Sequence, residues 1–236
     1  MLKIRLALSR TISSAVLCVI CTTWAKAGDN LLDGLATGPL DGQSGWSASS
    51  GIEVKEGAGG AGKVIEVTDF LPESLQANLP VTVPGTGSVS FRARASGLAS
   101  AKDSSGLFVV LSCSLSSDGR EPDPFFMIGL APNGNDIAWH AHGGGADGKS
   151  QGVVSDAAWY QFDVTFDISH GELGDNNQVD FTVKELTSGN IVAKESFQFP
   201  NQNGARKTLS NVQFVTGSKH GDSVWEVGSL MVEPAP

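Results

Sequence analysis

Two histidines, His140 and His142, stand two residues apart and run into the glycine triplet at 143–145. In a strand, residues i and i+2 project from one face, so the two imidazoles would lie side by side. Such a pair can bind one transition metal, and either ring can serve as a proton-transfer base. A third ligand is missing from the local sequence, although Asp136 has the same phase. The alternative interpretation is a polar strand face that ends in a flexible loop.

Arg92 and Arg94 are likewise two residues apart in an alternating segment. Two guanidinium groups on one face of a sheet suit acidic sugars, because each can hold a carboxylate through two hydrogen bonds. In a chain this acidic, the same arginines can instead pair with Asp or Glu on neighbouring strands. Uronate binding and structural ion pairs therefore both remain open.

Tryptophan rings can stack on the apolar face of a sugar. Four tryptophans are candidates: Trp46, Trp139, Trp159 and Trp225. Trp139 is in phase with Ile137, and Trp225 is in phase with Met231, so we expect both rings in the core. Trp159 falls on the polar face of its segment and is the best exposed candidate. Its alternative role is packing at the end of a strand.

Oxygen ligands for calcium are plentiful in the expected loops, at Asp118, Asp123, Asn133, Asn135, Asp136, Asp175 and Asn176. No segment has the fixed spacing of a known calcium loop, and Asn, Asp and Gly are also the residues that turns use. A structural calcium ion is therefore an open expectation, and the sequence implies no other cofactor.

The first 27 residues have the composition of a secretion signal. They combine Lys3, Arg5 and Arg10, an apolar stretch at 12–21 too short to span a bilayer, and the cleavage motif Ala-Lys-Ala at 25–27. We therefore expect an exported chain that begins near Gly28, forms one domain over residues 28–236, and works in the periplasm, at the cell surface or in the medium.

Cleavage would remove four of the 16 basic residues and leave all 25 acidic ones, which gives a formal charge of −13. Such a surface repels nucleic acid and anionic lipid. No second apolar run is long enough for a membrane helix. Cys113 would be the one remaining cysteine, which excludes an intrachain disulfide, and its phase places it in a buried strand.

The elements that must position these residues are short strands. In residues 160–169 apolar and polar side chains alternate strictly, which is typical of a strand with one buried face. Similar segments are expected at 52–55, 64–68, 88–95, 107–115, 125–130, 137–142, 178–184, 191–199, 208–215 and 224–232. About a dozen strands with turn residues between them predict an all-β, two-sheet antiparallel sandwich of the jelly-roll type.

Several stretches together resemble the concanavalin A-like lectin/glucanase superfamily, in the laminin-G-like form of secreted bacterial proteins. They are the Gly-Pro-Leu-Asp-Gly-Gln-Ser-Gly-Trp run at 38–46, Lys-Val-Ile-Glu-Val at 63–67, Ala-Trp-Tyr at 158–160, the Thr-Ser-Gly turn at 187–189 and the final strand at 224–232. The resemblance covers nearly the whole chain after residue 27. It implies a concanavalin A-like jelly roll, and among its members are lectins, glycan-binding modules, hydrolases and lyases.

The catalytic motifs of the enzyme members are incomplete here. Glucanase-like members carry an acidic triplet on one strand, and no such triplet is present: Asp163 and Asp167 lack both the spacing and the glutamate. Alginate-lyase relatives combine an arginine-rich strand with Gln-x-His and Tyr-x-Lys-x-Tyr strands. Here Arg92 and Arg94 stand without the other two motifs.

We therefore expect a carbohydrate-binding module whose concave sheet engages an extracellular polysaccharide, with Arg92, Arg94, His140, His142 and Trp159 as candidate ligand-binding residues. One alternative is a polysaccharide-degrading enzyme, most plainly a lyase that uses a histidine with an arginine of this set, and it requires those side chains to line one cleft. The other is a structural or protein-interaction module without a small ligand.

Overall fold

The computed structural model describes residues 28–57, 62–68, 75–100, 106–113, 123–131, 136–141, 149–151, 154–170, 176–200, 208–216 and 223–235. The strands are β1 (Gly38–Pro39), β2 (Ser47–Ala48), β3 (Ile52–Glu56), β4 (Lys63–Thr68), β5 (Gln76–Pro84), β6 (Thr86–Ser96), β7 (Leu107–Cys113), β8 (Asp123–Ala131), β9 (Asp136–Ala141), β10 (Lys149–Gln151), β11 (Trp159–Asp167), β12 (Asn176–Glu185), β13 (Ile191–Pro200), β14 (Thr208–Thr216) and β15 (Val224–Pro234). A 3-10 turn spans Leu98–Ser100.

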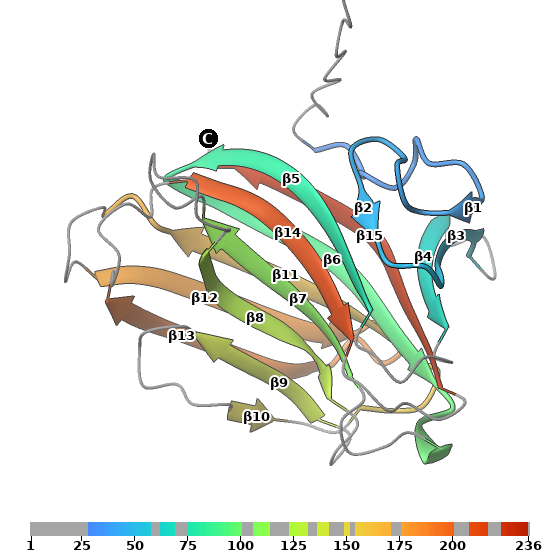
Figure 1. The fold of residues 1–236 in the computed structure, drawn as a ribbon. Helices are drawn as coiled ribbons and strands as arrows, with labels where there is room; N and C mark the ends of the chain where they lie inside the picture. Colours follow the sequence, from blue (N-terminus) through green and yellow to red (C-terminus); the bar gives the residue numbers. More distant parts are fainter. Residues whose placement is uncertain are drawn as a thin grey trace, which may run out of the picture.

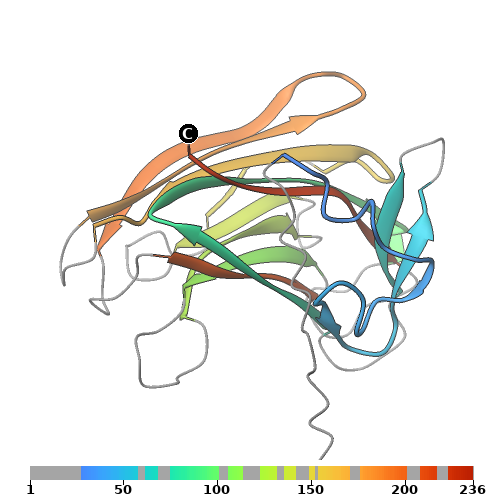
Figure 2. The same ribbon diagram turned by 90° about the horizontal axis from the view of Figure 1, so that it is seen from above.

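The strands form two antiparallel sheets that lie as separate layers (Figures 1 and 2). The eight-stranded sheet has the order β1-β3-β4-β15-β6-β11-β12-β13, and the seven-stranded sheet has the order β10-β9-β8-β7-β14-β5-β2. Strands that are neighbours in space are often distant in sequence, as β15 is from β4 and β6. The predicted two-sheet antiparallel sandwich is therefore confirmed.

Aromatic rings fill the space between the sheets. Phe181 of β12 meets Trp139 of β9 and Phe126 of β8, with ring centroids 4.9 and 6.1 Å apart. Phe166 of β11 meets Phe125 of β8 at 5.9 Å. All five side chains are buried, as are the apolar residues that share their phase. The strict alternation of buried and less buried residues along β11 thus shows which face of the strand the other sheet covers.

Most of the expected strands are present, but β5 was not foreseen. Pro80 and Pro84 lie within it, and proline cannot donate to a sheet ladder, so the sequence argues against a strand there. The structure accommodates Pro80 opposite Asn211, where β14 has a register shift, and only the two residues of β2 pair on the other side. Proline is thus tolerated at an irregular and nearly free edge.

The core assignments of Trp139, Trp225 and Cys113 are confirmed, since all three are buried. The expectation that Met231 shares the core with Trp225 is wrong. The pairing of β15 with β6 shifts by one residue between Gly228 and Met231, so that Leu230 enters the core and Met231 lies opposite the outward-facing Ser90. A β-bulge shifts the alternation of inward and outward residues by one position, and the apolar pattern of the sequence does not predict it.

Within the described residues, no helix is long and apolar enough to cross a membrane.

Gly129 of β8 marks the closest approach of two strands. A Cβ at this position would lie 1.9 Å from the carbonyl oxygen of Leu107 and 2.7 Å from the Cα of Phe108. Both atoms belong to the backbone of β7, so a side chain could enter only if the strands separated. We expect Gly129→Ala to lower the free energy of unfolding by more than about 3 kcal/mol, measured by urea denaturation. Gly34→Ala is the control, because its Cβ would meet nothing within 4 Å, and equal stability of the two variants would contradict this packing.

Candidate functional site

The outer face of the eight-stranded sheet carries rows of polar side chains that register brings together from different strands. Arg94 of β6 is paired with Trp159 of β11 on one side and with Glu226 of β15 on the other. Arg92, two residues away on the same face, is paired with Gln161 and Gly228. The predicted residues Arg92, Arg94 and Trp159 therefore lie in one place.

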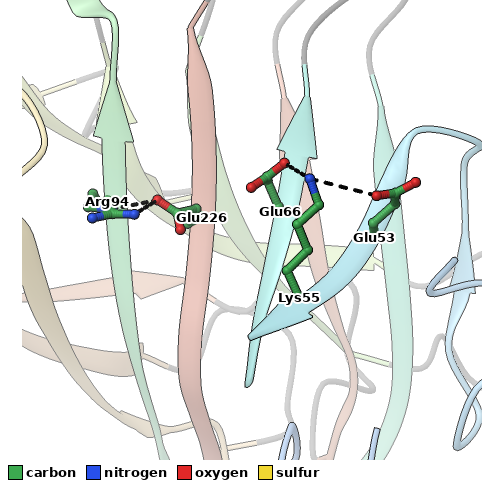
Figure 3. Close-up of polar contacts among 5 residues, drawn as sticks. All are labelled: Glu53, Lys55, Glu66, Arg94 and Glu226. Carbon is green, nitrogen blue, oxygen red and sulfur yellow. Dashed lines mark hydrogen bonds and ion pairs between the residues drawn. The ribbon is translucent and has the colours of Figure 1, made fainter. Parts of the chain in front are cut away.

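Arg94 is held by two partners. Its guanidinium forms an ion pair with Glu226 (Figure 3), and its central carbon lies 5.0 Å from the centroid of the Trp159 ring. The Glu226 side chain is only 6% exposed, and that of Arg94 is 22% exposed. A carboxylate so poorly hydrated needs a cation beside it. Arg94 therefore neutralises Glu226 and supports the indole, and its charge is already compensated within the protein.

A second charge cluster continues the same row. Lys55 of β3 forms an ion pair with Glu66 of β4, and its Nζ lies 3.7 Å from Oε2 of Glu53 (Figure 3). Hydrogen bonding to Glu66 is the main cause that raises the pKa of Lys55 above its usual value, with a further contribution from Glu53. Glu53, Glu66 and Glu226 face one another across β3, β4 and β15. Lys55 and Arg94 offset what would otherwise be repulsion between like charges.

Trp159 forms one wall of a surface pocket of about 190 Å³. Its ring reaches across β6 towards β15, because a Cβ on Gly228 would lie 3.6 Å from Cη2 of the indole. The absence of a side chain at Gly228 thus leaves room beneath the ring. The remaining lining comes from Val64, Arg92, Leu186, Thr187 and Ser229.

Arg92 is exposed at the rim of this pocket. Its Nε donates a hydrogen bond to Oε1 of Gln161 at 3.1 Å, which fixes the plane of the guanidinium. Gln161 is itself held, since its Nε2 donates to Oγ of Ser90 at 2.7 Å and to Oδ1 of Asp163 at 3.1 Å. Within the part of the chain that the structure describes, the terminal nitrogens of Arg92 form no hydrogen bond or ion pair. They are oriented and available to a ligand.

The bulge in β15 shapes the floor and rim of the pocket. Ser229 is the extra residue, and its φ of 53° is unusual for a residue with a side chain. Bulges commonly occur next to binding sites, where they redirect a side chain. Here the bulge places the hydroxyl-bearing Ser229 beside Gly228 in the pocket lining.

The two predicted histidines do not join the arginines. His140 lies on β9 beside Met127 of β8, on the outer face of the other sheet, because its neighbour Trp139 points into the core. The full thickness of the sandwich therefore separates His140 from Arg92 and Arg94. His142 lies outside the described residues. The cleft that a histidine–arginine lyase requires is not formed by Arg92, Arg94 and His140.

The expected calcium ligands are mostly outside the described residues, namely Asp118, Asn133, Asn135 and Asp175. Asp123 and Asp136 are described, and they stand at opposite ends of β8, since Asp136 pairs with Ala131. Asn176 begins β12 in the other sheet. Among the residues described, no group of three or more His, Cys, Asp and Glu side chains could hold a metal ion.

Several residues of the site were missed in the sequence. Glu226 sits between Trp225 and Val227 and carries no motif, so its pairing with Arg94 depends on strand order. Thr187 belongs to a turn that was predicted, and Leu186 directly precedes it. The position of both over β11 follows from the hydrogen bond that the amide of Leu186 donates to the carbonyl of Trp159, at 2.8 Å. Gly228, in the middle of a strand, was the one usable signal for close approach.

No protein-family model and no curated protein matches the chain. Solved structures do match it in fold. A PL-14 alginate lyase from Aplysia kurodai superposes with a TM-score of 0.51 and 10% identity, covering 78% of this chain and 87% of the lyase. The carbohydrate recognition domain of Emp46p superposes with a TM-score of 0.50 and 12% identity, covering 88% of this chain and 96% of that domain. A legume lectin-like domain from Entamoeba histolytica superposes with a TM-score of 0.50 and 11% identity, covering 81% of this chain and 91% of that domain.

These neighbours share the concanavalin A-like jelly roll. The chain has the concanavalin A-like fold. The resemblance noted in the sequence is thereby confirmed at the level of fold, and identities this low carry nothing further. The concanavalin A-like neighbours are mostly carbohydrate-binding domains, with some enzymes among them.

Removal of Arg94 should leave the buried Glu226 carboxylate without its cation and so lower the stability of the fold. We expect Arg94→Met to lower the free energy of unfolding by about 3 kcal/mol, because it strands a charge with little access to water. Arg92→Met is the matched control, and since Arg92 is exposed we expect a loss below about 1 kcal/mol. Urea denaturation at neutral pH measures both. Equal losses would show that Glu226 does not depend on Arg94.

Proposed function

We propose that this protein binds a carbohydrate non-covalently, and that the pocket beside Trp159 takes a sugar unit bearing a carboxylate. The observation that carries the proposal is the pairing of Arg92 with Trp159 in one pocket. An oriented guanidinium with unused N–H groups can hold a carboxylate through two hydrogen bonds, and an indole offers the flat apolar surface that a pyranose ring stacks on.

The rest of the lining supports the same ligand class. Leu186 and Val64 add apolar surface, and the hydroxyl groups of Thr187 and Ser229 can exchange hydrogen bonds with sugar hydroxyls. The volume of about 190 Å³ is below the roughly 300–1,000 Å³ of pockets for drug-sized ligands. The pocket therefore suits a single ring, with any further units of a chain lying outside it.

Binding without cleavage is proposed because the described residues of the pocket contain no acid–base pair. Glu226 and Glu66, which lie two residues from the lining residues Gly228 and Val64, are each engaged in an ion pair.

A matched pair of disaccharides tests the proposal: glucuronate linked to a neutral sugar, and the same disaccharide without the carboxylate. We expect Trp159→Ala to weaken both by about tenfold, through loss of about 1.4 kcal/mol of stacking. Arg92→Met should weaken the acidic disaccharide by about tenfold and leave the neutral one unchanged. Isothermal titration calorimetry measures the affinities.

Lys63→Met is the control for the loss of a positive charge, because Lys63 does not line the pocket and pairs with the exposed Glu56. Each titration mixture is also assayed for newly formed reducing ends. Unchanged affinities in both pocket variants would refute the site, and release of sugar would refute binding without cleavage.

We also propose that the chain is exported and cleaved before Gly28. The support is the order of charged, apolar and small residues in the first 27 positions. Expression with residues 1–27 in a bacterial host should yield a protein outside the cytoplasm whose intact mass corresponds to a start at Gly28. Retention in the cytoplasm at full length would refute export.

A further inference from the structure

Two lysines on the same outer face resemble Arg92 in forming no ion pair within the described residues. Lys184 of β12 and Lys194 of β13 are exposed, and in the described part of the chain neither forms an ion pair. By contrast, Lys55, Lys63 and Arg94 are each paired with a glutamate. In a protein with a formal charge of −9, cations left without a partner are the ones open to an anionic ligand.

Strand register places the three unpaired cations on one line. Arg92, Gln161 and Lys184 are successive partners across β6, β11 and β12, so Arg92 and Lys184 stand two strand spacings apart, roughly 10 Å. Lys194 is paired with Thr182, which puts it one strand beyond Lys184 and two residues along, roughly 8 Å away. The line runs from the pocket to the edge strand of the sheet.

A second hollow lies at the far end of this line. It has a volume of about 470 Å³ and is lined by residues of three consecutive strands, namely Asp163, Thr165, Asp180, Phe181, Thr182, Lys194, Glu195 and Ser196. This volume is within the roughly 300–1,000 Å³ typical of small-molecule sites. The hydrogen-bonded chain from Arg92 through Gln161 to Asp163 connects the two hollows.

The aspartate carboxylates in this hollow restrict which sugar units can bind there. Asp163 and Asp180 belong to adjacent rows of the second hollow, beyond the pocket and between the strands that carry Arg92 and Lys194. They would repel a carboxylate, but they can accept hydrogen bonds from sugar hydroxyls. Thr165, Thr182 and Ser196 are equally suited to hydroxyl groups. Between Arg92 and Lys184 the register places the uncharged Gln161, with Asp163 in the next row of the sheet and Asp180 in the row after that. Positions that attract an acidic sugar thus alternate with one that offers no cation.

We propose that the glycan site extends from the Trp159 pocket along Arg92, Lys184 and Lys194, and that its ligand is a linear polysaccharide in which acidic and neutral sugars alternate. This inference rests on the proposed function. The spacing of the cations supports it, because one pyranose unit extends a chain by about half of the distance that separates neighbouring cations. A homopolymer of uronates would instead place a carboxylate at Gln161, which offers no cation and is hydrogen-bonded to Asp163.

The test compares three ligands of equal length across a series from two to ten units: hyaluronan oligosaccharides, in which glucuronate alternates with N-acetylglucosamine, oligogalacturonate and chitin oligosaccharides. Calorimetry at low and physiological salt gives the affinities. We expect affinity for hyaluronan to rise with length until the three cations are spanned, and to exceed that for the other two ligands.

Lys184→Met and Lys194→Met should each weaken the longest hyaluronan ligand about twofold to fivefold, as expected for an exposed ion pair. Both variants should leave the disaccharide unaffected and reduce the salt dependence of binding to the long ligand. Lys63→Met removes the same charge away from the line and should change neither ligand.

The outcomes separate this inference from the proposed function. Equal affinity for short and long hyaluronan, with no effect of either lysine variant, would overturn the extended site and leave the Trp159 pocket as the whole site. Tighter binding of oligogalacturonate would overturn the alternation. Absence of binding by all three ligands and by the glucuronate disaccharide would overturn the proposed function itself.

Discussion

The contact between the two sheets is the constraint on which the rest of this structure depends. Rings such as Phe181, Trp139 and Phe126 must meet in a dry layer, so every second residue of the central strands is committed to the core. All chemistry is therefore confined to the positions in between, on the two outer faces. This is why His140 and the arginines, each on an outward phase, are separated by the whole thickness of the protein: they belong to different sheets.

Alternation allowed much of the fold to be predicted from the sequence. The strand β11 could be predicted residue by residue, because it is central and covered on one face throughout. The strand β5 could not, because Pro80 contradicts a ladder and is tolerated only where β14 is irregular. The shift at Ser229 was equally hidden, since a bulge depends on how β15 fits β6 and not on its own composition. The local apolar pattern shows which residues face inward, but it does not show where the pairing between neighbouring strands shifts in register.

The site was predictable in kind and only partly in detail. The sequence indicated Arg92, Arg94 and Trp159 as outward-facing, and register does bring them together. It did not distinguish the arginines, which differ in their cross-strand neighbours. Arg94 lies between the buried Glu226 and Trp159, whereas Arg92 lies between Gly228 and Gln161. Arg94 is consequently neutralised within the protein, whereas the guanidinium of Arg92 is left for a ligand. Such differences arise from strand order, which no single segment encodes.

The bulge at Ser229 also separates residues that belong to the core from residues that line the pocket. Residues before and after it, such as Val227 and Leu230, are fully buried and bound to the core. Gly228 and Ser229, where the alternation is interrupted, contribute to the pocket lining and not to the layer between the sheets. Substitutions at these two positions can reshape the pocket while the sandwich keeps its packing. The same scaffold can in this way diverge in what it recognises without first losing its capacity to fold.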